Sequence, residues 1–428
     1  GGLPILSKID YETHNRNLEE SGLEPFVGTG PYILDSMDVG KSVSYRRNPN
    51  YWGEDLPFNV GQNNFDRIRI EYYADYNAAF EGFKAGNYTF RNEASSIQWA
   101  TGYDFPAVKS GDVIKVELPD GNKANGQAFL FNLRRQKFQD PKVREALGLM
   151  FNFEWSNATL FYDLYSRINS VWENSWLAAE GAPSPEEVAI LKPLVEQKLL
   201  PDSILTEPAV MAPVSGARQL DRENLRKASD LLDDAGWLVG PDGMRRNDKG
   251  ETLAIEVLND SQTFDRVINP FVENLRKLGV DAKMTHVDDA QMEARTRPPV
   301  YDFDLIVGNA RSNYISGSEL KQYYGSQTAD VSSFNVMGLK DKAVDQLIDV
   351  VLAAKTNDEL TVATKALDRV LRSTRFWIPQ WYKDKHTVAY YNMYEHPKDL
   401  PPYALGELSI WWYNADKAAA LKAAGALD

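Results

Sequence analysis

The chain has 428 residues, of which 43% are hydrophobic and 25% charged, which is typical of a globular protein with two or more domains. Its net charge is −14, from 47 basic and 61 acidic residues. This argues against nucleic acid as a partner, because phosphate backbones are bound by clustered Lys and Arg. There is no cysteine, which excludes a disulfide scaffold and a thiol nucleophile. The histidines are scattered, so we predict no metal site and no cofactor; they are His14, His286, His386 and His396.

The first part of the chain carries turn and strand signals, and no apolar run approaches the roughly 18 residues that a membrane-spanning helix needs. Gly and Pro mark turns at residues 28–32 and 48–53. Alternating or continuous apolar residues predict short strands at 43–46, 68–72, 113–118 and 127–133.

Helical signals begin at Asp140 and Pro141, a good N-cap followed by a good first helical residue. Residues 180–220 are rich in Pro and Ser and predict a long connection with one helical piece at 185–198. Beyond residue 222 the pattern alternates between strand and helix, which is typical of a sheet covered by helices. The expected helices are 225–235, 264–278 with a kink at Pro270, 341–354 and 358–373. The expected strands are 253–257, 283–287 and 303–307, followed by an aromatic β region at 377–394.

Several passages resemble the family-5 extracellular solute-binding proteins of ABC importers, the dipeptide and oligopeptide binders. They are VGTGPY at 27–32, RNPNYW at 47–52, FNL at 131–133, FQDPKVREAL at 138–147 and ASDLLDDAGW at 228–237. Others look like the YejA-like branch of that family: NLRRQKF at 132–138, FNFEW at 151–155, TLFY at 159–162, FDLIV at 303–307 and IPQWYK at 378–383. Their shared order extends across nearly the whole chain.

The resemblance implies an α/β protein with the two-lobed periplasmic-binding-protein fold (type II, cluster C), each lobe a mixed sheet flanked by helices. We expect a first lobe at 1–130, a second lobe at 131–384 and a return to the first lobe at 385–428. The implied function is capture of oligopeptides or modified peptides in the periplasm by hinge closure, and delivery to an ABC permease in the inner membrane. The implied protein is a monomer and not an enzyme.

Two departures from the family pattern qualify this prediction. A long segment that precedes GTGPY in the family is absent, so we expect the first lobe to lack its N-terminal part, which is cleaved, disordered or a separate segment. Residues 309–314 lack a tryptophan that the resemblance implies early in this segment, and they also lack the aspartate that it implies for holding a peptide amino terminus. An opine, a sugar or another non-peptide solute therefore stays open as the ligand.

The segment after the strand 303–307 supplies the first candidate ligand contacts, because ligands of open α/β sheets bind at the carboxyl ends of strands. These candidates are Asn309, Arg311, Ser312 and Tyr314. Arg311 could hold a carboxylate through paired hydrogen bonds, and Glu319 is a candidate partner for a ligand ammonium. The alternative interpretation is a polar surface loop with a structural arginine.

A second group of candidates lies elsewhere in the chain. Arg134 and Arg135 could bind a carboxylate, or instead form a solvated pair or a salt bridge to an acid such as Glu145. The candidate pocket aromatics are Trp172, Trp176, Trp377, Trp381 and Tyr382, and core packing is the favoured alternative for any one of them. Trp176 follows Trp172 at the i,i+4 spacing of one helical face.

Acid pairs leave a less favoured alternative, a carboxylate-dependent hydrolase. Asp288 and Asp289 are adjacent and would point to opposite faces of a strand. Asp302 and Asp304 would share a face, so they are the pair that a catalytic role would use. A chaperone-like role is a further alternative, and the absence of any stabilising small ligand would support it.

Overall fold

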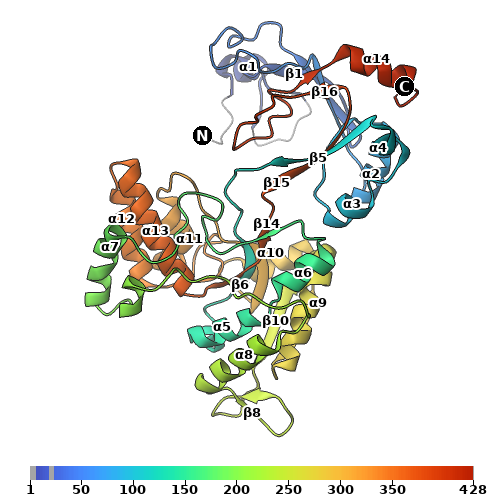
Figure 1. Ribbon diagram of the computed structural model, residues 1–428. Coiled ribbons are helices and arrows are strands. Elements are labelled where there is room, and N and C mark those ends of the chain that lie inside the picture. Colours follow the sequence, from blue (N-terminus) through green and yellow to red (C-terminus); the bar gives the residue numbers. More distant parts are fainter. Residues whose placement is uncertain (1–5, 19–23, 428) are drawn as a thin grey trace. The chain divides into compact units, whose positions relative to one another are not determined.

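The chain divides into two compact units. The computed structural model describes residues 6–18 and 24–427. The first unit combines residues 1–120 with 385–428, and the second is the continuous stretch 121–384. The chain therefore passes from one unit to the other twice, at 120/121 and at 384/385 (Figure 1). Among the helices of the described residues, none combines the length and the apolar character that crossing a bilayer requires.

The first unit is built on small antiparallel sheets. One sheet has the order β1 (Tyr32–Asp38), β2 (Ser42–Arg47) and β3 (Arg67–Glu71). A second has β15 (Lys385–Tyr391) between β4 (Phe90–Asn92) and β5 (Val113–Pro119), and a third pairs β16 (Tyr394–Glu395) with β17 (Trp412–Tyr413). The helices of this unit are α1 (Lys8–Thr13), α2 (Tyr76–Lys84), α3 (Ser96–Thr101), α4 (Pro106–Ser110) and α14 (Ala415–Ala423). Because β15 comes from the returning chain, the two parts of this unit share one sheet.

The second unit is built on one five-stranded mixed sheet. Its order is β11 (Asp281–His286), β10 (Ala254–Asn259), β12 (Leu305–Asn309), β6 (Gln127–Phe131) and β13 (Trp377–Pro379). The pairs β10–β11 and β10–β12 are parallel, whereas β6 is antiparallel to both β12 and β13. Two short pairs accompany it: β7 (Ser166–Arg167) with β14 (Trp381–Tyr382), and β8 (Leu238–Val239) with β9 (Arg245–Arg246).

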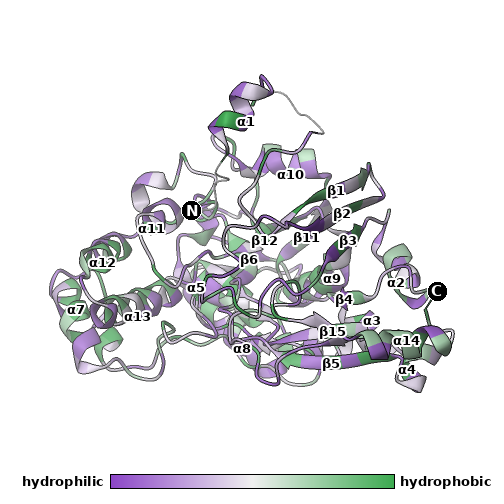
Figure 2. Ribbon diagram, turned by 90° about the horizontal axis from the view of Figure 1, so that it is seen from above, coloured by the Kyte–Doolittle hydropathy of each residue, from purple (hydrophilic) through white to green (hydrophobic). Residues whose placement is uncertain are grey.

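Amphipathic helices cover this sheet and form a continuous apolar core with it. The helices are α5 (Pro141–Leu149), α6 (Phe153–Leu160), α7 (Pro185–Glu196), α8 (Arg222–Asp234), α9 (Gln262–Lys277), α10 (Asp289–Thr296), α11 (Glu319–Tyr324), α12 (Lys342–Ala353) and α13 (Asn357–Ser373). Three short 3₁₀ turns join them: η1 (Gln136–Phe138), η2 (Asp202–Leu205) and η3 (Ser326–Thr328). α7, α12 and α13 pack as one group, α5 packs on α8, and α9 packs on β10 and β11 (Figure 1). Hydrophilic and hydrophobic residues alternate along α12 and α13, as amphipathic packing requires (Figure 2).

The local signals for helices agree with the structure. Asp140 caps α5 by accepting a hydrogen bond from the backbone N–H of Lys142, and Pro141 is its first residue. Gly236 and Gly279 follow α8 and α9 with φ of +81° and +89°, a conformation that glycine adopts at little cost. α9 runs through Pro270 as one element.

The expected first boundary at residue 130 differs from the observed division. β6 (127–131), which that boundary assigned almost wholly to the first lobe, lies inside the sheet of the second unit between β12 and β13. Its backbone hydrogen bonds go to those strands, so the structure moves the division to 120/121. The segment that passes between units is therefore the connection before β6 rather than β6 itself.

Candidate functional site

The segment after β12 lies at a particular edge of the five-stranded sheet. Asn309, the last residue of β12, is opposite Gln127, the first residue of β6. Pro379, the last residue of β13, is opposite Ala128. The carboxyl ends of β12 and β13 therefore meet the amino end of β6. Since the chain enters β6 soon after 120/121 and leaves the unit soon after β13, both passages between units start at this edge, which we call the crossing edge.

Hydrogen bonds from neighbouring segments fix the loop 309–319 at the crossing edge. The backbone N–H of Ala310 donates to the carbonyl of Gly126 at 2.9 Å. The Ser312 hydroxyl donates to the carbonyl of Val171 at 2.7 Å and is buried. The indole N–H of Trp172 donates to the carbonyl of Asn313 at 3.0 Å. The loop is thus held by the segments before β6 and around residue 172, and Ser312 serves as one of its anchors.

An aromatic pair projects from the same edge. The rings of Tyr314 and Trp176 stack with centroids 5.3 Å apart and an interplanar angle of 11°. The backbone N–H of Lys123 donates to the Tyr314 hydroxyl at 2.6 Å, which holds that ring in place. Trp176 is 52% exposed, so one face of the pair is open to a ligand.

Glu319 has an internal role in this loop. Its carboxylate accepts hydrogen bonds from the side-chain amide of Asn313 at 2.9 Å and from the backbone N–H of Gly317 at 2.8 Å. Burial by itself would raise the pKa of Glu319, but these hydrogen bonds outweigh it and the pKa is lowered. The carboxylate therefore stabilises the loop, and the structure offers no reason to pair it with a ligand ammonium.

Arg311 and Asn309 remain accessible on the loop. The Arg311 guanidinium lies 5.2 Å from the centre of the Phe334 ring, and its side chain is exposed. Its backbone carbonyl accepts a hydrogen bond from the Tyr324 hydroxyl at 2.7 Å, which anchors the chain at that point. Asn309 ends β12 in an exposed position. Both side chains are thus free to reach a solute from a fixed backbone.

Arg134 and Arg135 lie at the opposite edge of the sheet. They follow β6 at its carboxyl end, and β6 is antiparallel to β12, so they cannot meet the loop 309–319. Arg134 lies over the Tyr301 ring at 3.5 Å and donates to several backbone carbonyls, including that of Val336 at 2.8 Å. Their donors hold the second unit together, which agrees with the alternative interpretation of a salt bridge, although the acids are Asp302 and Asp304 and not Glu145.

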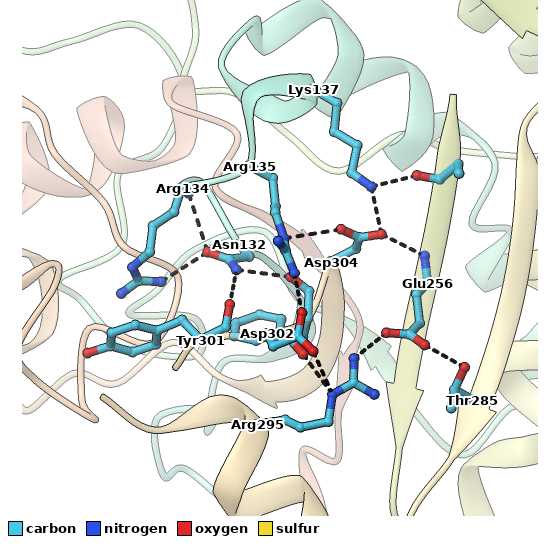
Figure 3. A network of polar contacts seen from close by, with 12 residues as sticks. Asn132, Arg134, Arg135, Lys137, Glu256, Thr285, Arg295, Tyr301, Asp302 and Asp304 are labelled. Atoms are coloured by element: carbon cyan, nitrogen blue, oxygen red, sulfur yellow. Dashed lines mark hydrogen bonds and ion pairs between the residues drawn. The ribbon is translucent and has the colours of Figure 1, made fainter. Parts of the chain in front are cut away.

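Arg135 belongs to a network of ion pairs with the acids that were candidates for catalysis. It lies 2.7 Å from Asp302 and 3.5 Å from Asp304 (Figure 3). Lys137 also contacts Asp304 at 2.7 Å, and Arg295 contacts Asp302 at 3.4 Å. The hydrogen bond from Arg135 lowers the pKa of Asp302, whereas a general acid for glycoside hydrolysis needs a raised one.

The aromatic candidates divide between the core and the crossing edge. Trp172, Trp377 and Trp381 are 0%, 6% and 9% exposed and belong to the apolar core, which agrees with the alternative interpretation of core packing. Trp381, for example, packs 4.5 Å from the ring of Phe161. Tyr382 is half-buried at the end of β14, and burial with the nearby charges of Glu173 and Asp384 raises its pKa to about 12. Tyr382 and its neighbour Trp381 form β14, a few residues before the second passage between units.

A separate cavity of about 640 Å³ lies elsewhere in the second unit. Trp377, Arg144 and Arg375 are among its lining residues, and none of its lining residues comes from the loop 309–319. Arg375 is paired with Glu145 at 3.0 Å, and Arg144 donates to backbone carbonyls such as that of Thr374. Its cations already have internal partners, so the crossing edge is the stronger candidate.

One residue of the crossing edge, Lys123, was missed by sequence reasoning. Lys123 lies in a stretch with no helix or strand pattern, and nothing local indicates that it reaches Tyr314. Trp176, by contrast, was among the predicted pocket aromatics, and it lies at the crossing edge beside Tyr314. Within residues 6–18 and 24–427, no group of three His, Cys, Asp or Glu side chains is placed to hold a metal ion.

Comparison with known proteins agrees with this fold. The family model for "Bacterial extracellular solute-binding proteins, family 5 Middle" matches residues 3–331. A relative from Agrobacterium fabrum named "Probable peptide-binding protein YejA" is 41% identical over 400 residues, which is 93% of this chain and 64% of the relative. A second relative from that organism, "Peptidoglycan-binding protein YepA", is 32% identical, and the match covers 96% of this chain and 66% of the relative.

The solved structures show the same fold at lower sequence identity. The oligopeptide-binding protein AppA from Bacillus subtilis, solved in complex with a nonapeptide, matches with a TM-score of 0.63 at 18% identity. The match covers 90% of this chain and 66% of AppA. The mixed sheets flanked by helices are thus those of periplasmic binding proteins, as the sequence predicted. The chain spans about two thirds of the length of these relatives, and 64% of the first.

Proposed function

Because the chain belongs to the bacterial extracellular solute-binding proteins of family 5, we propose that it captures a peptide or a peptide-containing solute in the periplasm and delivers it unaltered to an ABC permease in the inner membrane. The observation that carries this proposal is the crossing edge. An accessible loop and an aromatic pair are fixed there, at the place where both passages between the units begin. We propose that Asn309, Arg311, Tyr314 and Tyr382 contact the solute.

The proposed mechanism is closure of the two units on the solute. Motion about two short connections, at 120/121 and 384/385, needs backbone changes in only a few residues. A solute that gains contacts with the first unit only in the closed state shifts the equilibrium toward that state by the free energy of those contacts. The protein acts as a monomer in this proposal.

A peptidoglycan fragment is the second candidate, favoured by one relative and one structural feature. The relative is the protein named "Peptidoglycan-binding protein YepA". The feature is the open face of Trp176, because a flat aromatic face accommodates the apolar face of a sugar as well as a peptide side chain. A fragment with both sugar and peptide would use the same surface as a free peptide.

The experiment that tests the function is equilibrium binding followed by identification of the bound molecule. The purified chain is incubated with a mixture of tri- to pentapeptides and, separately, with soluble peptidoglycan fragments, and retained molecules are identified by mass. We expect retained molecules with unchanged masses. Retention of neither mixture would refute the proposal, and retained molecules of lower mass that account for a cleaved bond would support a hydrolase instead.

A further inference from the structure

Lys123 carries a charge that its surroundings do not balance. Its side-chain ammonium donates to the carbonyl of its neighbour Ala124 at 3.3 Å, and no carboxylate among the described residues of the second unit forms an ion pair with it. Burial lowers the pKa of Lys123, and no opposite charge counters this effect. A half-buried cation without an anion costs free energy that an incoming anion would recover.

The other charges of the loop increase the imbalance. Glu319, the acid of that loop, already accepts hydrogen bonds from Asn313 and Gly317. Arg311 adds a second cation, and within the described part of the second unit it forms no ion pair. The protein has a net charge of −14, so an excess of positive charge at this surface is a local feature.

The aromatic pair gives this cation a defined neighbour. The backbone N–H of Lys123 is bonded to the hydroxyl of Tyr314, and the Tyr314 ring stacks on Trp176. Lys123 therefore belongs to the segment that positions the aromatic pair. The backbone of Lys123 thus lies beside the aromatic pair that a ligand on Trp176 would contact.

We infer that the Lys123 ammonium binds a carboxylate of the solute, while the adjoining group of the solute lies on Trp176. This inference rests on the proposed function and names the chemical class of the solute: a molecule with a free carboxylate beside a flat or apolar group. Free-acid peptides and the stem peptides of peptidoglycan both have this chemistry. The ammonium–carboxylate hydrogen bond is of the charge-assisted kind, which is stronger than a neutral one.

The test compares each peptide with its carboxyamide, which lacks the terminal charge. The wild-type chain and the variants Lys123→Met, Arg311→Met and Trp176→Leu are each titrated with a tri- to pentapeptide mixture in the acid form and in the amide form. We expect the wild type to prefer the acid form roughly tenfold or more, which is the size expected for a hydrogen bond between charged groups. Lys123→Met should bring the preference close to one, whereas Trp176→Leu should weaken both forms alike.

The matched control is Lys192→Met, which removes an exposed lysine of α7 in the same unit and should leave the preference unchanged. Titration with peptidoglycan fragments separates the two sources of carboxylate. Equal binding of acid and amide by the wild type overturns the inference alone. A preference that survives Lys123→Met, or that is lost with Arg311→Met instead, also overturns it. Failure of the wild type to bind peptides or peptidoglycan fragments removes the proposed function together with the inference.

Discussion

At the scale of single residues, Asp368 in α13 links the core to the crossing edge. It is fully buried, and its carboxylate accepts hydrogen bonds from the backbone N–H groups of Val171 at 3.1 Å and Ala179 at 3.0 Å. It also pairs with Arg372, one turn later in the helix, at 2.6 Å. The segment between these two backbone contacts carries Trp172 and Trp176, so a core carboxylate fixes the position of the exposed aromatic.

Replacing this carboxylate should be costly. In Asp368→Asn, Arg372 would remain buried without its anion, and we expect the free energy of unfolding to fall by about 3–5 kcal/mol. Urea unfolding monitored by circular dichroism measures this loss. Asp248→Asn, which changes an exposed turn residue, is the control and should alter stability by less than about 0.5 kcal/mol. Equal stability of the two variants would contradict the role of Asp368.

Glu256 makes the stability depend on pH. Burial by itself would raise its pKa, but hydrogen bonds from Thr285 at 2.7 Å and from Arg295 at 2.5 Å outweigh it and lower the pKa below the ordinary value of 4.5 (Figure 3). A carboxylate with a lowered pKa in the folded state stabilises the protein above its ordinary pKa. That stabilisation is lost as the pH falls through the lowered value.

Unfolding midpoints at pH 7 and pH 3.5 test this dependence. The wild-type chain should lose stability on acidification, and Glu256→Gln should lose less because it has no carboxylate to protonate at this position. The two proteins should therefore differ more at pH 7 than at pH 3.5. A difference that is the same at both pH values would show that Glu256 stabilises the fold without its charge.

The residue scale also shows where sequence reasoning stops. The i,i+4 spacing of Trp172 and Trp176 predicted one helical face, but residues 171–178 form turns and bends. The Trp172 side chain is therefore buried, whereas Trp176 is 52% exposed. The ligand-contact predictions for Asn309, Arg311 and Tyr314 rest on a local rule about strand ends and remain predictions. Lys123 had no local signal because its partner Tyr314 lies far along the chain.

At the scale of elements, local signals were enough for most helices and not for strand pairing. Asp140 caps the start of α5 and Gly236 follows the end of α8. Such caps lie next to their helices in the sequence, so the sequence predicts them directly. The antiparallel pairing of β6 with β12 joins residues more than 170 positions apart and leaves no local pattern. That pairing decides that Arg134 and Arg135 lie opposite the crossing edge, a position that no local pattern indicates.

The variant Gly126→Ala tests the contact between the segment before β6 and the loop 309–319. Its φ is +64°, and a Cβ there would collide with the carbonyl oxygen of Ala310. Gly250 has a φ of +78° but no atom within 4 Å of the Cβ position, so it is a matched control. We expect Gly250→Ala to cost about 1 kcal/mol from backbone strain and Gly126→Ala to cost clearly more. Equal losses, measured by urea unfolding, would show that the contact is not close.

At the scale of the whole molecule, the account depends on two passages of the chain. The first unit is completed by β15 from the returning chain, and the second is continuous between the passages. The resemblance to the family implied a first lobe interrupted by the second, with a return at residue 385. Each unit has its own apolar core, so each is expected to move as a body.

The most direct test of this account uses the absence of cysteine in the chain. Asp55→Cys in the first unit and Asp248→Cys in the second place one spin label on each unit, and Lys192→Cys with Asp248→Cys places both on the second. Distance distributions are measured by pulsed electron paramagnetic resonance, without solute and with solute bound. The account predicts a shorter and narrower distribution for the first pair and no change for the second. An unchanged distribution between the units, with solute bound, would contradict capture by closure.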